Sequence, residues 1–417
     1  MKEIRIQGGK GLFGEIDIQG AKNSILPVLA ATILCGGECV IHNCPNLSDV
    51  DTSVRILRNL GCSCSVEGNT VTVNSRDINC CEIPDDLMRE MRSSIVFLGA
   101  ILARCGKAVL SSPGGCELGP RPIDLHLSSL KRMGVSIKEE HGMLSCTCES
   151  RIKGETINLC FPSVGATENI ILAAATADGI TTINNAAKEP EISDLADFLN
   201  SAGARIYGAG SDTIVIHGVE KLHGTNHSII PDRIVAATYM AAAVMNGGEI
   251  KLKNVMPSNM VSLLWAFNEC GCKTEVNCRS ITVKSNGELK RIPTVRSLVY
   301  PGFPTDAGPI LISMLSISKG TSVFVENIFE SRYKYIDELK RFGAKIKTEG
   351  KVAVIEGVRK LSAANVRCTD LRGGAALVLA GLVAEGETKI SEIHHIERGY
   401  DDIVGTLSSV GAIISQE

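Results

Sequence analysis

The chain has 417 residues, of which 44% are hydrophobic and 21% are charged, and its formal net charge is −3. These values are typical of a soluble globular protein, and the length suggests two or three domains with separate cores. The near-balanced charge and an aromatic content of 4% argue against a basic nucleic-acid surface and against base-stacking platforms. An anionic ligand would therefore depend on a few local Arg and Lys side chains.

Residues 1–5 lead straight into an alternating, strand-like run, so no secretory or transit segment is expected. The longest apolar runs, such as residues 170–177, are far shorter than the roughly 18 residues of a membrane span. The 16 cysteines include no Cys-x-x-Cys spacing and, with eight histidines, supply no zinc ligand set. We therefore expect a cytoplasmic protein with reduced cysteines, no metal, and no membrane or nucleic-acid partner.

One pattern recurs along the chain. Each copy has an apolar helix, a Gly, a short strand, a second helix that ends in Gly, and a pair of strands. The Gly that ends the second helix falls at Gly61, Gly134, Gly203, Gly271, Gly343 and Gly411. These positions are about 70 residues apart, so six copies account for the whole chain.

The first helix of each copy is apolar nearly all round, which predicts that it is buried on every side. In chain order, these helices are expected at residues 24–34, 94–103, 168–177, 234–244, 309–317 and 375–384. The second helices, such as residues 337–343, are amphipathic and should cover the outside. Strands of period two, such as residues 213–218 and 352–357, lie between them. The pattern predicts an α+β fold in which sheets enclose buried helices.

The last copy is short, because only six residues follow Gly411. Residues 1–20 have the form of the missing strand pair, so we expect this N-terminal hairpin to complete the last copy. Two three-copy domains result. The first spans residues 21–230 and carries a loop with Cys116, and the second spans residues 231–417 together with 1–20. Two crossing strands near residues 20 and 230 would join them and would permit closure around a ligand.

Polar residues gather where each buried helix starts. They are Lys22, Asn23, Arg92, Ser163, Thr167, Asp232, Arg233, Thr305, Asp306, Asp370 and Arg372. Helix N-termini attract anions, and Ser, Thr and Asp are also ordinary caps there. Capping does not explain the Lys and Arg residues, since the helix dipole disfavours a cation at this end. We therefore favour a phosphate or carboxylate site over capping.

The second copy contains a longer loop, PGGCELGPRPIDLH at residues 113–126. Its Gly and Pro content indicates a surface loop, where function concentrates. Most cysteines of this chain should be core residues, but Cys116 stands in this loop with Arg121 nearby to favour its thiolate. We therefore predict that Cys116 is reactive. The pair His394–His395 has no partner ligands in the sequence, so a structural or surface role is expected for it.

These motifs resemble those of the UDP-N-acetylglucosamine 1-carboxyvinyltransferases, a branch of the enolpyruvyl transferase family. The matching segments include IQGAKNSILP, PGGCELGPRPIDLH, PSVGATEN, FPTD, DLR and HIERGYD, in family order along the whole chain. The resemblance implies a two-domain inside-out barrel with three βαβαββ units per domain. It also implies transfer of the enolpyruvyl group of phosphoenolpyruvate to the 3′-hydroxyl of UDP-N-acetylglucosamine, without a cofactor. That reaction releases phosphate and is the first committed step of bacterial peptidoglycan biosynthesis.

The resemblance also implies roles for individual residues. Lys22, Arg121 and Arg398 would hold phosphoenolpyruvate, with Asn23 nearby. Residues proposed for the nucleotide sugar are Arg92, Arg121, Pro122, Ile123, Asp124, Leu125, Ser163, Val164, Gly165, Asp306 and Ile328.

For catalysis, the resemblance implies that Asp306 takes the proton of the attacking hydroxyl and that Cys116 delivers a proton to the methylene carbon. Lys22 and Arg398 would stabilise charge on the leaving phosphate. Asp370 would complete the catalytic set. Supporting positions would be Asp232, Arg233, Arg332 and Arg372.

Two alternatives stay open at this point. A 5-enolpyruvylshikimate-3-phosphate synthase would share the fold and the donor, but it should begin its first helix with a DGSKS-like stretch and lack the Cys loop. A non-catalytic UDP-sugar-binding relative would share the fold without needing Lys22, Cys116, Asp306 and Arg398 together. The sequence does not indicate the oligomeric state.

Overall fold

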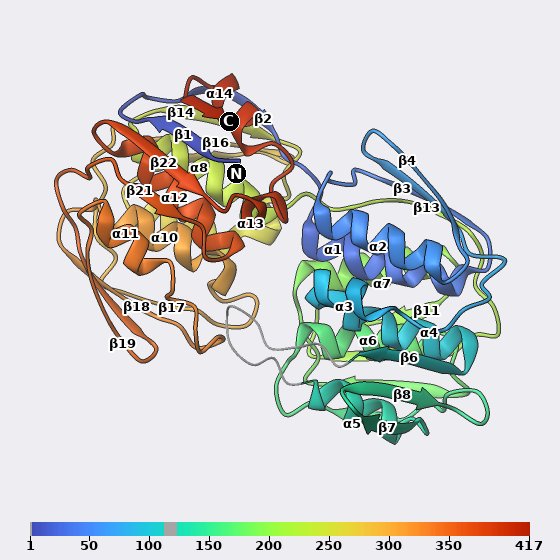
Figure 1. Cartoon of the computed structure of the whole chain (residues 1–417). Coiled ribbons are helices and arrows are strands. Elements are labelled where there is room, and N and C mark those ends of the chain that lie inside the picture. Colours follow the sequence, from blue (N-terminus) through green and yellow to red (C-terminus); the bar gives the residue numbers. More distant parts are fainter. Residues whose placement is uncertain (1, 112–122) are drawn as a thin grey trace. The chain divides into compact units, whose positions relative to one another are not determined.

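The computed structural model describes residues 2–111 and 123–417. These residues divide into two compact units, with boundaries at residues 19–20 and 230–231. One contains residues 20–111 and 123–230 and is called the 20–230 unit; the other contains residues 2–19 and 231–417 and is called the 231–417 unit. Both mix helices and sheets, as Figure 1 shows, so the predicted α+β class is confirmed.

Three helices at the centre of the 20–230 unit are almost entirely buried. They are α1 (Lys22–Ala31), which continues into the 3₁₀ segment η1 (Thr32–Cys35), α4 (Phe97–Cys105) and α6 (Val164–Ala174). Around them lie α2 (Ser48–Asn59), α5 (Asp124–Arg132) and α7 (Pro190–Ser201), with the short α3 (Asp85–Glu90) and η2 (Arg92–Val96). The helix predicted from residue 94 begins only at Phe97, because residues 92–96 form the tighter 3₁₀ turn.

Sheets enclose these helices. The sheet orders are β13 (Asn226–Ser228)–β3 (Glu38–His42)–β5 (Thr70–Asn74)–β4 (Ser63–Glu67), β11 (Arg205–Tyr207)–β12 (Thr213–His217)–β10 (Ile180–Asn184)–β9 (Thr156–Asn158), and β6 (Lys107–Ser111)–β8 (Met143–Thr147)–β7 (Ser136–Glu140). In each sheet, one strand runs parallel to a segment from another copy: β13 beside β3, β9 beside β10, and Glu82 beside Val109 in β6. These parallel contacts tie the three copies of the unit into a ring.

The 231–417 unit repeats this plan. Its buried helices are α8 (Arg233–Met245), α10 (Gly308–Leu315) and α12 (Leu371–Val383). The other helices are α9 (Val261–Glu269), α11 (Ile336–Arg341), α13 (His394–Glu397) and α14 (Ile403–Ser409), with η3 (Pro257–Met260) and η4 (Thr305–Ala307). Two of its sheets have the orders β15 (Lys273–Val276)–β16 (Ser280–Lys284)–β14 (Glu249–Lys253)–β2 (Phe13–Asp17) and β17 (Thr294–Arg296)–β18 (Thr321–Val325)–β20 (Val352–Glu356)–β19 (Lys345–Glu349). The third has the order β21 (Asn365–Arg367)–β22 (Glu387–Ser391)–β1 (Ile4–Gln7)–β23 (Ile413–Gln416).

The first two strands do not form the predicted hairpin. Strand β1 lies between β22 and β23 and pairs antiparallel with both, so Ile4 faces Ile390 and Gln416. Strand β2 instead runs parallel to β14, with Phe13 opposite Glu249. The hairpin prediction is wrong because the chain leaves the sheet of the last copy after β1 and joins the sheet of the fourth copy. The corresponding segments β13, β9, β17 and β21 pass to another copy in the same way.

The predicted helix-ending glycines are confirmed by their backbone conformation. Gly61, Gly134, Gly203, Gly271, Gly343 and Gly411 all have positive φ angles, from 86° to 105°. A left-handed residue directly after a helix is a common C-terminal stop, and glycine adopts it without a Cβ penalty. The sixfold repeat therefore has a structural counterpart at each of its six positions.

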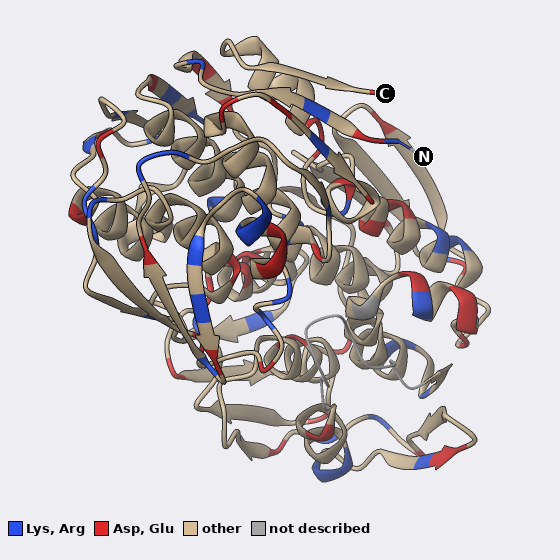
Figure 2. Cartoon of the chain, turned by 60° about the vertical axis from the view of Figure 1, so that its left-hand side comes forward, with Lys and Arg blue, Asp and Glu red and all other residues tan. Residues whose placement is uncertain are grey.

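The described cysteines are all free, and many are buried. Burial raises the pKa of the Cys146 thiol to about 11 and that of Cys270 to about 12. Acidic and basic residues are interspersed along the strands and helices (Figure 2). Among the described residues, no helix is long and apolar enough to cross a membrane.

Candidate active site

The start of α1 holds a nearly buried ammonium group. Lys22 is the first residue of the helix, and its Nζ lies 2.9 Å from Oδ2 of Asp49 on α2. The Lys22 side chain is 12% exposed and that of Asp49 only 2%. The N-cap residue, Ala21, offers no side-chain oxygen to the free N–H groups of the first turn. A cation therefore stands at a helix start that lacks a side-chain cap, while Asn23 is exposed beside it.

A buried carboxylate on α7 orients this turn. The hydroxyl of Ser24 donates to Asp194, and Nε2 of His227 lies 2.9 Å from Oδ1 of the same carboxylate. The main-chain N–H of Ile230 also approaches Asp194, at 3.5 Å. Asp194 therefore ties the helix that begins with Lys22 to strand β13 and to the end of the unit. Sequence reasoning missed this residue.

The start of α6 is capped, and it lies against the start of α5. The Ser163 hydroxyl accepts from the N–H of Ala166, and Thr167 donates to the carbonyl of Ser163. Both residues therefore support the helix start, and the predicted contact of Ser163 with the nucleotide sugar stays a prediction. Gly165 packs closely on the ring of His126, and Ile123 is the N-cap residue of α5. The predicted segments 123–125 and 163–165 are thus neighbours in the 20–230 unit.

In the 231–417 unit, Asp306 lies between two buried arginines. Nη2 of Arg332 is 3.0 Å from Oδ1, and Nε of Arg372 is 3.2 Å from Oδ2. Both arginine side chains are 3% exposed, whereas that of Asp306 is 26% exposed. Although burial acts in the opposite direction, Asp306 and Tyr400 keep the pKa of Arg372 above its ordinary value. The structure brings these three predicted residues together, with the carboxylate on the accessible side.

This cluster contains buried polar atoms that no protein group satisfies. Among the described residues, Nε of Arg332, Nη1 of Arg372 and the hydroxyl of Tyr335 have no hydrogen-bond partner. Burial also raises the pKa of the Tyr335 hydroxyl well above its usual value, so it stays a neutral donor. Buried polar groups are normally paired, so such atoms indicate a place for water or ligand oxygens.

A second buried carboxylate, Glu326, fixes the loop that carries Asp306. Its Oε1 accepts from the Ser297 hydroxyl at 2.7 Å and from the N–H of Ile328 at 2.8 Å. Its Oε2 accepts from the Thr305 hydroxyl at 2.8 Å. Glu326 is 1% exposed and directly follows strand β18. It therefore couples Ile328 to the turn before Asp306, and only the position of an acid at the end of an apolar strand could have indicated it.

Asp232 and Asp370 act as helix caps. Oδ1 of Asp370 accepts from the N–H groups of Arg372 and Gly373, and Oδ1 of Asp232 accepts from those of Ile234 and Val235. One oxygen of each carboxylate therefore serves as a helix cap, and the predicted site roles of Asp232 and Asp370 stay predictions.

The remaining predicted cations of this unit lie near main-chain or aromatic groups. The Arg233 guanidinium lies 5.4 Å from the centre of the Tyr300 ring. Arg398 is half-buried and directly follows α13. Gln19 accepts from the N–H of Asp401 at 2.9 Å and donates to the carbonyl of Gly399 at 3.3 Å. The backbone that follows Arg398 is therefore held in place.

Some predicted site residues lie outside the description. Cys116, Arg121 and Pro122 fall outside the described residues, and Arg92 is described only as the first residue of η2.

His394 and His395 stack with ring centres 4.1 Å apart. Within residues 2–111 and 123–417, no group of three or more His, Cys, Asp or Glu residues could hold a metal ion.

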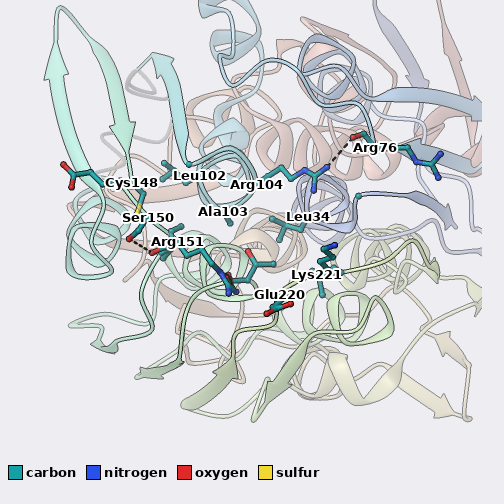
Figure 3. Close-up of a pocket in the computed structure, with 16 residues that line it drawn as sticks. Leu34, Arg76, Leu102, Ala103, Arg104, Cys148, Ser150, Arg151, Glu220 and Lys221 are labelled. Atoms are coloured by element: carbon teal, nitrogen blue, oxygen red, sulfur yellow. Dashed lines mark hydrogen bonds between the residues drawn. The ribbon is translucent and has the colours of Figure 1, made fainter.

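A cavity of about 590 Å³ lies at the other end of the buried helices of the 20–230 unit (Figure 3). Its lining includes Leu34 near the end of η1 and Leu102 near the end of α4. Arg151 donates to the carbonyls of Thr176 and Val219 at 2.8 and 2.9 Å, and Arg104 reaches the carbonyl of Arg76 at 3.4 Å. Arg104 stands in the last turn of α4, and the carbonyl of Thr176 directly follows the C-cap of α6, so both cations lie where the helix dipole favours them. The cavity contains none of the predicted site residues.

A family model described as EPSP synthase (3-phosphoshikimate 1-carboxyvinyltransferase) matches residues 6–407. The chain belongs to this family, the enolpyruvyl transferases. Among its relatives, UDP-N-acetylglucosamine 1-carboxyvinyltransferase 2 of Caldanaerobacter subterraneus subsp. tengcongensis is 54% identical over 414 residues, which are 99% of both chains. UDP-N-acetylglucosamine 1-carboxyvinyltransferase of Thermotoga maritima is 45% identical over 415 residues, covering 99% of this chain and 98% of the relative.

Solved structures confirm the enolpyruvyl transferase fold. The enolpyruvyl transferase NikO from Streptomyces tendae has a TM-score of 0.91 at 26% identity and covers 100% of this chain and 98% of its own. An EPSP synthase from Acinetobacter baumannii has a TM-score of 0.77 at 19% identity, with full coverage of both chains, and this similarity shows the fold alone.

The Glu326 contacts lead to a stability prediction. Replacing Glu326 with Ala leaves the buried Ser297 hydroxyl and the N–H groups of the half-buried Ile328 and Phe329 without this acceptor, which should lower the free energy of unfolding by about 2 kcal/mol or more. Glu330→Ala, an exposed change four residues later, should cost less than about 0.5 kcal/mol. Urea unfolding of both variants measures the difference. Equal, small losses would show that Glu326 does not organise this loop.

Proposed function

We propose that this chain transfers the enolpyruvyl group of phosphoenolpyruvate to the 3′-hydroxyl of UDP-N-acetylglucosamine and releases phosphate. The observation that carries the proposal is its 54% identity, over 99% of both chains, to a protein named for this activity. The reaction is the first committed step of bacterial peptidoglycan synthesis. Since its substrates are a nucleotide sugar and a small phosphate ester, we place the enzyme in the cytoplasm.

The reaction requires a base, an acid and several cations. The 3′-hydroxyl oxygen attacks C2 of phosphoenolpyruvate and loses its proton to a base, while an acid delivers a proton to C3. The bond between C2 and the phosphate oxygen then breaks, and C3 loses a proton, which restores the double bond. The intermediate and the departing phosphate carry several negative charges, so nearby Lys and Arg side chains lower the barrier.

Asp306 is the proposed base. Its two oxygens are held by Arg332 and Arg372. Because each carboxylate oxygen has more than one lone pair, these two contacts alone do not prevent it from accepting a hydroxyl proton. The two arginines are buried, whereas the carboxylate is partly exposed. The arginines therefore orient Asp306 and make almost no contact with solvent. This assigns Arg332 and Arg372 a positioning role. Oδ1 of Asp370 caps α12. Asp370 would therefore contribute to the site either through Oδ2 or by fixing the first turn of α12.

The proposed phosphoenolpyruvate ligands are Lys22, Asn23, Arg121 and Arg398. The ammonium of Lys22 suits a phosphate or carboxylate, because it stands at the start of α1, where the positive end of the helix dipole also attracts an anion. The side chain of Gln19 hydrogen-bonds to the main chain of Gly399 and Asp401, and so fixes the backbone that directly follows Arg398. For the nucleotide sugar we propose residues 121–125, 163–165, Arg92, Asp306 and Ile328.

The family model carries the description of a different acceptor, shikimate 3-phosphate, so a parallel assay decides between them. Purified enzyme should release phosphate from phosphoenolpyruvate with UDP-N-acetylglucosamine and not with shikimate 3-phosphate. Asp306→Asn should lower kcat at least about 100-fold, because it removes the base. Release with shikimate 3-phosphate alone would overturn the acceptor. Binding of the nucleotide sugar without any release would indicate a non-catalytic relative.

Cys116 is the proposed acid, and its reactivity can be tested with the epoxide fosfomycin. Its thiolate would attack an epoxide carbon, so that a C–S bond forms, the ring C–O bond breaks and the oxygen takes a proton. Intact-protein mass spectrometry should show one adduct on the wild-type chain and none on Cys116→Ser. Cys160→Ser, which removes an exposed cysteine, should be labelled like the wild type. An adduct that persists in Cys116→Ser would exclude this role.

A further inference from the structure

A fully buried amide, Asn169, stands in helix α6. Thr167 and Glu168, which are also buried, precede it, and the apolar residues Ile170, Ile171 and Leu172 follow it. A buried amide without partners is costly, so its hydrogen bonds show what it does. Each of them reaches another segment of the 20–230 unit or the start of its own helix.

Asn169 caps helix α4 from a different helix. Its Oδ1 accepts from the N–H of Gly99 at 2.7 Å, and its Nδ2 donates to the carbonyl of Ile95 at 3.0 Å. The N-cap residue of α4 itself, Val96, provides no side-chain oxygen. Asn169 therefore supplies the cap that the sequence of α4 lacks.

Position 99 must be glycine for this contact. A Cβ on Gly99 would lie 2.4 Å from the main-chain oxygen of Asn169 and 3.0 Å from its Oδ1. The two helices approach each other so closely that no side chain fits between them. Gly99 and Asn169 therefore act as a pair.

The same amide determines which nitrogen of His126 carries a proton. The N–H of Gly99 can only donate, so the Asn169 oxygen must face it and the Nδ2 group must face the other partners. Nδ2 lies 2.9 Å from Nδ1 of His126, which must therefore accept. Burial lowers the pKa of His126 to about 4, although Asp124 acts in the opposite direction. The ring is therefore neutral at pH 7, with its proton on Nε2.

The proton-bearing edge of His126 lies at the start of α6. A Cβ on Gly165 would lie 3.0 Å from Cε1 and 3.3 Å from Nε2 of the ring. Nδ2 of Asn169 also approaches the carbonyl of Gly165, at 3.4 Å. Asn169 thus joins the starts of three helices: α4, which follows Arg92; α5, which begins with Asp124; and α6, which follows Ser163.

We propose that Asn169 is a positioning residue for nucleotide-sugar binding. It holds the segments 123–125 and 163–165 in one arrangement and keeps His126 as the Nε2–H tautomer beside them. This inference rests on the proposed function, because those segments are assigned to the nucleotide sugar there. It adds a residue without substrate contact on which that binding depends.

The test is the nearly isosteric change Asn169→Asp. It keeps an oxygen for the N–H of Gly99, but it places a second oxygen against the carbonyl of Ile95 and against Nδ1 of His126. His126 must then take a proton on Nδ1 or lose this contact. Asn200→Asp is the matched control, since Asn200 on α7 is exposed and its side-chain amide hydrogen-bonds to the main chain of Ile206.

Isothermal calorimetry and steady-state kinetics give the first readout. Asn169→Asp should raise the Kd for UDP-N-acetylglucosamine about tenfold or more, while the KM for phosphoenolpyruvate changes less than about twofold. Asn200→Asp should leave both constants unchanged. Unchanged nucleotide-sugar affinity in Asn169→Asp would overturn the inference. An equal loss for both substrates would show a general structural defect and would also overturn it.

Nitrogen-15 NMR of histidine-labelled protein gives a readout that needs no activity. The His126 signals, identified by their loss in His126→Gln, should show a protonated Nε2 and an unprotonated Nδ1 from pH 8 to pH 5.5. In Asn169→Asp they should titrate within this range or show a proton on both nitrogens. A wild-type ring protonated on Nδ1 would overturn the inference. Wild-type protein with the expected tautomer but no affinity for the nucleotide sugar would instead show that the proposed function fails.

Discussion

Six helices with no polar face impose the arrangement of everything else in this chain. Each is enclosed by sheets and outer helices, so its polar main-chain groups can be reached only at its ends. The two ends differ in charge. In the 20–230 unit, Arg104 stands in the last turn of α4 and Arg151 donates to the carbonyl of Thr176 just after α6, where the helix dipole favours a cation. Lys22 stands at an N-terminal end, where the dipole opposes it. The carboxylate of Asp49, 2.9 Å from the Lys22 ammonium, compensates this cation, and phosphoenolpyruvate is the anion proposed to bind beside it.

In the 231–417 unit, Asp306 and two arginines compensate one another's charge. Two buried guanidinium groups would be costly alone, and a carboxylate between them compensates their charge. This arrangement keeps the oxygens of Asp306 at fixed positions while the side chain remains partly accessible. Glu326 accepts a hydrogen bond from the hydroxyl of Thr305, the residue before Asp306, and so fixes the preceding turn. The rigidity that a catalytic base needs is thus provided by residues that do not themselves have to contact substrate.

Much of the fold was predictable from sequence because it depends on local patterns. A glycine with positive φ after each second helix, such as Gly203, and an apolar first helix, such as α12, are visible in single segments. Strand partners are not visible in this way, and β1 was therefore expected beside β2 although it pairs with β22 and β23.

The same difference between local and long-range features applies to the candidate site. Residue types at helix starts led to Lys22, Asp306 and Arg372, but not to the buried residues Asp194, Glu326 and Asn169 that fix the neighbouring segments. Asp194 acts on Ser24 from 170 positions away, and Asn169 acts on Gly99 from 70 positions away. The capping role of Asp370 depends on the φ and ψ angles of one residue, which composition does not reveal. Such long-range contacts between buried polar groups required the structure.

The central claim is that this chain joins an enolpyruvyl group to the 3′-oxygen of UDP-N-acetylglucosamine. The most direct measurement is NMR of the product formed from phosphoenolpyruvate labelled with carbon-13 at C2. We predict a vinyl-ether carbon that shows a three-bond correlation to the H3′ proton of the sugar, together with free phosphate. Labelled phosphoenolpyruvate that stays intact with the nucleotide sugar, or a correlation to a different acceptor, would contradict the claim.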